Sequence, residues 1–117
     1  MGLDTSHNCW HGPYSSFMSF RKELAKVANI PDLDSMDGFG GTFPWDELRP
    51  DIIHVLLNHS DCDGQIDAVY CLPPALRLEE LAPSLLDYGP VSHRVQAKRF
   101  ATGLRLAAER GESVEFH

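Results

Sequence analysis

The chain has 117 residues, of which 43% are hydrophobic and 23% charged, ordinary values for one soluble globular domain. This composition excludes a disordered, collagen-like or disulfide-scaffold protein, because a chain of this size buries enough surface to hold a hydrophobic core. We therefore expect a single domain over residues 1–117.

The chain is acidic, with ten Lys and Arg against seventeen Asp and Glu and a formal charge of -7. Such a chain repels nucleic-acid phosphates, and no apolar run reaches the ~20 residues of a membrane span. We expect neither nucleic acid nor membrane as a partner. The three cysteines, Cys9, Cys62 and Cys71, are an odd number and follow no signal peptide, which indicates free thiols in the cytoplasm.

The first half of the chain predicts an ordered loop and two helices. Polar and aromatic residues closed by Gly12-Pro13 indicate a loop over residues 1–13. A helix capped by serine is expected over 15–29, with an apolar stripe at spacings of three and four. The stripe consists of Phe17, Phe20, Leu24 and Val27, and Arg21, Lys22 and Lys26 lie off it. Residues 50–58 are almost wholly apolar and predict a buried second helix.

The second half predicts two more helices. One begins at Pro73 or Pro74 and is interrupted by Pro83, since proline suits a first turn but removes a hydrogen bond inside a helix. The other spans 92–110, with Ser92 as cap and Gly111 as stop. The fold class expected is mainly α, a compact four-helix domain.

Basic residues gather in the last helix. They are Arg94, Lys98, Arg99, Arg105 and Arg110, half of those in the chain. Such a segment either holds a small anion or, as is more usual, forms the solvated face of a helix.

The segment His59-Ser-Asp61-Cys-Asp63-Gly64-Gln-Ile resembles the loop of a calcium-binding EF-hand between two helices. Its first and twelfth positions hold His59 and Tyr70, where calcium requires carboxylates. Histidine and cysteine favour zinc instead, so the predicted metal ligands are His59, Asp61 and Asp63, with zinc preferred to calcium.

The same residues have a purely structural interpretation. Asp61 and Asp63 can shape a tight turn through their own backbone, and His59 can cap the preceding helix. None of the usual zinc spacings occurs in the chain.

The N-terminal segment is dense in groups that bind ligands. Trp10 and Tyr14 can stack a flat molecule while nearby imidazole and hydroxyl groups supply hydrogen bonds. The predicted ligand-binding residues are His7, Trp10, His11, Tyr14, Ser15 and His117. The alternative is that Trp10 plugs the open end of a helical bundle and the histidines lie at its rim.

Catalysis is permitted but not assigned. Cys9 with His7 or His11 matches a nucleophile and a base in residue type only, and His11 or His59 is equally permitted as a general base. No glycine-rich phosphate loop is present, because the glycines at 38–41 have no following lysine.

Three segments together resemble a family of small uncharacterised proteins from actinobacteria and their phages. They are Gly2-Leu-Asp-Thr-Ser-His7 continuing to Trp10-His-Gly-Pro-Tyr-Ser15, then Leu56-Leu-Asn-His59-Ser-Asp-Cys-Asp-Gly64, and the ending Glu115-Phe-His117. The resemblance spans most of the chain and implies no established activity. It implies that the two termini and the central loop form one unit.

These observations lead to three hypotheses of function. The first, which we favour, is a small non-enzymatic binding module whose N-terminal loop, central turn and tail hold a small polar ligand or block a host protein. The second is a metal-dependent hydrolase that uses the same His and Asp residues. The third is an interaction protein with an acidic surface, formed by Asp32, Asp34, Asp37, Asp46, Glu47 and Asp51.

Overall fold

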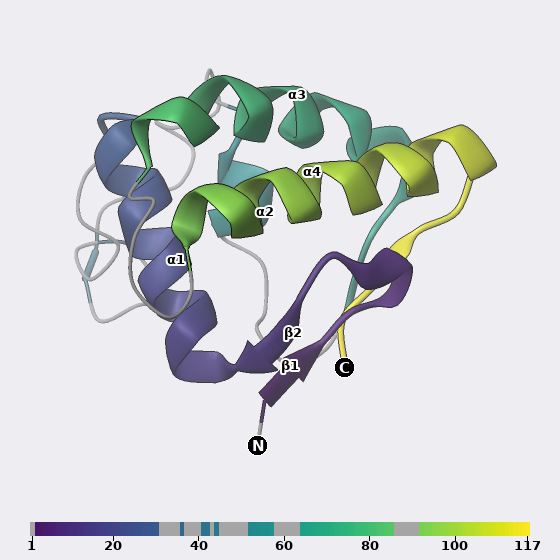
Figure 1. Cartoon of the computed structure of the whole chain (residues 1–117), viewed down its shortest axis with the longest axis horizontal. Helices are drawn as coiled ribbons and strands as arrows, with labels where there is room; N and C mark the ends of the chain where they lie inside the picture. Colours follow the sequence, from purple (N-terminus) through teal and green to yellow (C-terminus); the bar gives the residue numbers. More distant parts are fainter. Residues whose placement is uncertain are drawn as a thin grey trace.

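Three helices dominate the part of the chain that the computed structural model describes. They are α1 (Tyr14–Val27), α3 (Leu72–Leu81) and α4 (His93–Arg110). The most extensive contact joins α3 to α4, which lie side by side, and α1 lies across the end of this pair at the start of α4 (Figure 1). The mainly helical prediction is therefore confirmed. The described residues are 2–30, 36, 41–42, 44, 52–57, 64–85 and 92–117.

The ends of α3 and α4 lie where local chemistry places them. Ser92 Oγ accepts a hydrogen bond from Val95 N at 3.3 Å, and Gly111 ends α4 in the left-handed conformation with φ 65°. α3 stops at Leu81, and the tighter turn Ala82–Ser84 holds Pro83, which has no N–H to continue an α-helix. These boundaries confirm the caps predicted for the last helix and the interruption predicted at Pro83. The serine cap predicted for the first helix is wrong, because α1 begins at Tyr14, directly after Pro13, and no side chain caps it.

The predicted second helix over 50–58 is only partly confirmed, and the described residues hold three long helices where four were predicted. Only one helical turn, α2 (His54–Leu57), forms there, while residues 50–51 and 58 lie outside the described part. Ile53, Leu56 and Leu57 are fully buried. The apolar character of these residues therefore reflects their burial. One helical turn can bury them as well as a long helix can, so the apolar run did not by itself specify the length of the helix.

The described residues also give no support to an EF-hand. Residues 58–63, which include His59, Asp61, Cys62 and Asp63, lie outside them. Directly after Gly64 the chain forms the short strand β3 (Gln65–Ile66), which pairs with the C-terminal tail, and then the turn Ala68–Tyr70.

The N-terminal segment forms a hairpin, so the prediction of a loop without strands is wrong. β1 (Gly2–Asp4) pairs antiparallel with β2 (His11–Pro13). Only Leu3 of β1 is buried between two exposed residues. Strands of three residues are too short to show the alternation from which a strand is recognised in sequence.

Both chain ends meet beside Gly64. β4 (Val114–Glu115) pairs antiparallel with β3, and Phe116 N donates to Gly64 O at 2.9 Å. His117 N donates to Asp4 O at 2.8 Å, and Asp4 N donates in return to His117 O at 3.3 Å. Gly64 and the two terminal segments therefore lie together (Figure 1), whereas the rest of the central turn, residues 58–63, lies outside the described residues.

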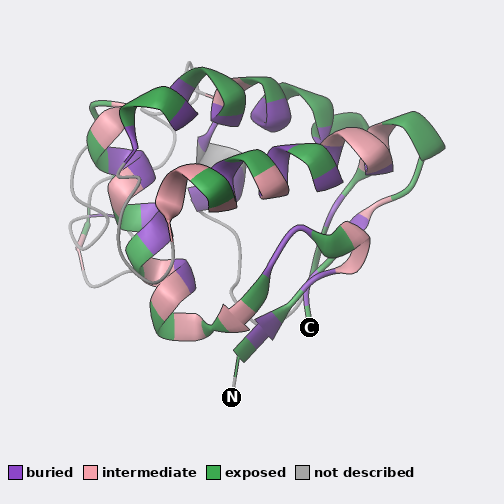
Figure 2. Cartoon of the chain, in the orientation of Figure 1, coloured by how far each residue is buried: buried purple, intermediate pink, exposed green. Residues whose placement is uncertain are grey.

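Five aromatic rings fill the centre of the core. The Trp10 ring centroid lies 5.1 Å from that of Phe17 and 5.3 Å from that of Phe20. Phe116 lies 6.2 Å from Phe17 and 6.4 Å from Phe100. The rings come from the hairpin, α1, α4 and the tail, and each of these elements contains buried residues (Figure 2). The radius of gyration, 13.2 Å, is that expected of a compact chain of this length.

Arg21 is buried although it lies off the apolar stripe of α1. Its side chain is 1% exposed, its guanidinium carbon lies 4.6 Å from the Phe17 ring centroid, and its Nη1 donates to Leu57 O at 3.1 Å. Burial removes water from the guanidinium group, and the hydrogen bond to a carbonyl and the cation–π contact offset this cost of desolvation. Arg21 thus joins α1 to α2.

Two neighbours on the tail provide a test of this core. Phe116 is 3% exposed, whereas His117 is exposed. We expect Phe116→Ala to lower the free energy of unfolding by about 3–5 kcal/mol, because a buried ring is replaced by a cavity. His117→Ala should change it by less than about 0.5 kcal/mol. Both free energies are measured by unfolding in urea. If the two variants lost equal free energy of unfolding, the position of the tail would not depend on the Phe116 ring.

Gly103 provides a second test, because the start of the chain packs directly against it. A Cβ atom there would lie 2.8 Å from His7 O and still closer to Cys9 Sγ. Although alanine favours helices over glycine by about 1 kcal/mol, we expect Gly103→Ala to destabilise the protein by about 1–3 kcal/mol through overpacking. Thr102→Ala, on the exposed face of the same turn, is the control. A stabilised Gly103→Ala variant would contradict this packing.

Candidate functional site

Trp10 belongs to the core and not to a ligand site. It is 2% exposed and packs against rings of α1. This burial favours the alternative in which Trp10 fills space inside the fold, because almost none of its ring surface is accessible to a flat ligand. Tyr14, at the start of α1, is partly buried and packs against the same core.

His7 anchors the N-terminal turn to the far end of α4. Its Nε2 lies 2.9 Å from Glu112 Oε1 and its Nδ1 lies 2.8 Å from Ser6 Oγ. The next residue, Asn8, is held by Arg99, which donates from Nε to Asn8 O at 3.0 Å. His7 and Asn8 both adopt positive φ angles, 59° and 56°. Both ring nitrogens of His7 are engaged, so it has a structural role.

His11 lies on the hairpin surface, apart from the core. It is exposed, and its Nδ1 lies 3.3 Å from Asp4 Oδ1. The pair borders a shallow pocket of about 460 Å³ formed by β1 and β2. His117, which is also exposed, meets Asp4 through backbone hydrogen bonds.

The structure brings no metal site together within its described residues, where no group of three His, Cys, Asp or Glu side chains could hold an ion. The predicted ligands His59, Asp61 and Asp63 all lie outside these residues. Zinc binding by the central turn therefore stays a prediction.

Cys9 is a core residue without the properties of a nucleophile. It is fully buried, and burial raises the pKa of its thiol from 9.0 to about 12. Burial also raises the pKa of Cys71, whose thiol donates to Asp67 O at 3.3 Å. The thiolate is the reactive form of cysteine, so the pairing of Cys9 with His7 or His11 gives no catalytic dyad at neutral pH.

This burial predicts how Cys9 reacts. At pH 7.5 we expect iodoacetamide to leave Cys9 unmodified in the native protein and to modify it after unfolding in urea, as measured by peptide mass spectrometry. Because the folded pKa is raised, the contribution of this thiol to stability is complete below pH 9 and falls between pH 9 and about 12. Modification of Cys9 in the native protein at pH 7.5 would contradict its buried position.

The basic residues of α4 mostly tie this helix to its neighbours. Arg94 Nη2 donates to Pro83 O at 3.1 Å and to Leu85 O at 3.3 Å. Arg105 Nε donates to Glu79 Oε2 at 2.7 Å, and this hydrogen bond lowers the pKa of Glu79. With Arg99 bound to the N-terminal turn, these groups join segments of the fold and form no common anion site.

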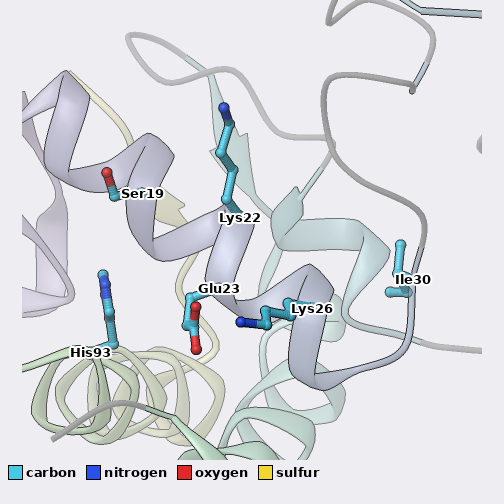
Figure 3. Close-up of a pocket in the computed structure, with 6 residues that line it drawn as sticks. All are labelled: Ser19, Lys22, Glu23, Lys26, Ile30 and His93. Carbon is cyan, nitrogen blue, oxygen red and sulfur yellow. The ribbon is translucent and has the colours of Figure 1, made fainter.

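A pocket of about 520 Å³ lies between α1 and the start of α4 (Figure 3). It lies along a polar side of α1, next to the apolar stripe, where His93 stacks on Phe20. The described residues that line it are Ser19, Lys22, Glu23, Lys26, Ile30 and His93. A smaller hollow of about 160 Å³ continues from it along α1 and shares Ser19 and His93 with it. Ser15 and Ser16 complete that hollow, so Ser15 is the one predicted ligand residue that lies here.

His93 is fixed in this pocket by its neighbours. It is the first residue of α4, and its ring stacks on Phe20 with centroids 6.1 Å apart and planes 24° apart. Phe20 in turn packs against Trp10. The Nδ1 atom of His93 is buried and has no hydrogen-bond partner among the described residues. The core therefore holds the His93 ring in place, while the Nδ1 atom of that ring makes no hydrogen bond to the described residues.

The described residues of the pocket lining are positive on balance in an acidic protein. Among them Lys22 and Lys26 against Glu23 leave one positive charge, whereas the whole chain carries -7. In Figure 3 the ends of Glu23 and Lys26 lie in the space between α1 and α4, and Lys22 points away from His93. The first turn of α4 contains no acidic residue to offset the positive end of the helix dipole.

The sequence patterns did not predict this site. They place Lys22 and Lys26 off the apolar stripe of α1 and give no role to Ser19, Glu23 or His93. A signal did exist, because Ser15, Ser19, Lys22 or Glu23, Lys26 and Ile30 recur at helical spacing. What the sequence could not show is that α4 begins opposite this face.

No protein-family model, curated protein or solved structure matches the chain. The resemblance to actinobacterial and phage proteins therefore stays a hypothesis. None of the helices in the described ranges combines the length and the apolar character needed to cross a lipid bilayer.

Proposed function

We propose that the protein is a small non-enzymatic binding module that holds a small anion, such as a phosphate or a carboxylate, in the pocket between α1 and α4. The observation that carries this proposal is that Lys26, His93 and Ser19 line one pocket beside the start of α4, which is the positive end of that helix. A cation, an imidazole and a hydroxyl supply the hydrogen bonds and charge that phosphate and carboxylate oxygens require.

Glu23 restricts which anions fit the pocket. Its carboxylate shares the pocket with Lys26 and opposes a ligand whose groups are all negative. The same carboxylate accepts a hydrogen bond from a hydroxyl or ammonium group. The ligand that fits is therefore an anion that also carries a donor, as the monoanion of phosphate does.

Two observations favour binding over catalysis. Within the described residues no hydrogen bond joins Ser19 to His93, so the pocket has no paired nucleophile and base. Cys9, the other candidate nucleophile, is sealed in the core with a raised pKa. The phage or actinobacterial setting, and with it sequestration of a host molecule, is part of the proposal and rests on the sequence motifs alone.

Charge variants of the pocket test the proposal. Isothermal titration with inorganic phosphate at low salt should show binding that Lys26→Gln weakens about five- to tenfold, the effect of about 1 kcal/mol from one partly exposed charge. Glu23→Gln should strengthen binding, because it removes the opposing charge. Both side chains lie at the surface of α1, so neither substitution disturbs the core.

Lys98→Gln is the matched control, since Lys98 is an exposed helical lysine outside the lining residues. It should leave phosphate binding unchanged. Equal weakening by Lys26→Gln and Lys98→Gln would show a diffuse charge effect in place of a site. Absence of binding for phosphate and for acetate would overturn the proposal.

A further inference from the structure

An exposed apolar surface extends from the turn Ala68–Tyr70 into the start of α3. Val69 and Tyr70 are 74% and 54% exposed, and Leu72 and Leu76 are 41% and 44% exposed. These four residues, the α3 patch, follow one another from the turn Ala68–Tyr70 into the first two turns of α3. Leu72 and Leu76 are one helical turn apart and so share a face.

The α3 patch is not needed by the core. The inner face of the same segment already buries Cys71, Ala75, Leu78 and Leu81. Figure 2 shows the outer side of α3 as largely exposed. Single exposed apolar residues are common, but four within eight residues form a surface typical of a protein interface, and Tyr is enriched at the centres of such interfaces.

Carboxylates border the α3 patch. Asp67 is exposed immediately before it, and its carboxylate accepts a hydrogen bond from Gln65 Nε2 at 2.8 Å. Glu115, also exposed, stands opposite Gln65 in the pairing of β3 with β4. At the far end, Glu79 and Glu80 are balanced by arginines, Arg105 and Arg77, in ion pairs. The end of the patch at Asp67 is therefore negative.

We propose that the α3 patch binds a basic amphipathic helical segment of another protein. Apolar side chains of that segment would cover Tyr70, Leu72 and Leu76, and its Lys or Arg residues would reach Asp67 and Glu115. Charge selects this occupant over two others. A second copy also carries -7, and an anionic lipid surface carries the same sign, so both are repelled. The surface is separate from the pocket between α1 and α4, and it takes a partner of the opposite charge.

A pair of synthetic helices tests the proposal. One is an 18-residue amphipathic peptide of Leu and Lys, and the other keeps the Leu positions but replaces Lys with Glu. In fluorescence anisotropy the Lys peptide should bind the full chain, and the double variant Leu72→Ser, Leu76→Ser should bind it at least about tenfold more weakly. The Glu peptide should not bind. Both replaced residues are partly exposed, and a thermal melt checks that the variant stays folded.

Val95→Ser is the control, because Val95 is 58% exposed on α4 and does not belong to the α3 patch. It should leave binding of the Lys peptide unchanged. The proposal is overturned if Val95→Ser weakens binding as much as the double variant, or if both peptides bind equally. It is also overturned if sedimentation shows a dimer that the double variant abolishes, or if the chain binds vesicles of anionic lipid through this surface.

Discussion

The packing of five aromatic rings is the constraint on which the rest of this structure depends. Trp10, Phe17 and Phe20 come from the hairpin and from α1, which follows it directly, whereas Phe100 and Phe116 come from α4 and the tail, far along the chain. Each ring is buried only because the others are in place. The hairpin is far too short to be stable alone, and the tail strand has two residues. Their order is therefore a consequence of the ring cluster.

The same cluster reaches the candidate site. Phe20 contacts Trp10 on one side and His93 on the other, so the indole fixes a ring that in turn supports the pocket imidazole. A ligand that bound to His93 would meet a side chain already held in one position, which lowers the entropic cost of binding. Trp10, which looks like a ligand-binding residue in the sequence, thus acts on the pocket from inside the core.

Local rules in the sequence predicted the helices but not what joins them. The cap at Ser92, the stop at Gly111 and the break at Pro83 each depend on chemistry within a few residues, and all three are observed. β4 pairs with β3 and its neighbour Phe116 with Thr5, partners about 50 and 111 positions away, and no local pattern encodes such pairs. The pocket escaped prediction for the same reason: its α1 face is visible as a periodic pattern, but His93 comes from another helix. Burial of Arg21 also escaped local reasoning, since it requires Leu57 O and the Phe17 ring.

The arrangement of charge explains how one small acidic chain can offer two different surfaces. Most basic side chains of α4 with described contacts are used inside the fold, where Arg94, Arg99 and Arg105 bind carbonyls or a carboxylate. Lys22 and Lys26 are the positive groups on the pocket face of α1, and their field acts against Glu23 alone among the described lining residues. Exposed pairs such as Arg105 with Glu79 add little stability because solvent screens them. These ion pairs cancel charge at the C-terminal end of α3. The segment before the N-terminal end of α3, which contains Asp67, stays negative. In the two proposals, separation of the two signs on different elements would let an anion and a basic segment bind without competing for the same groups.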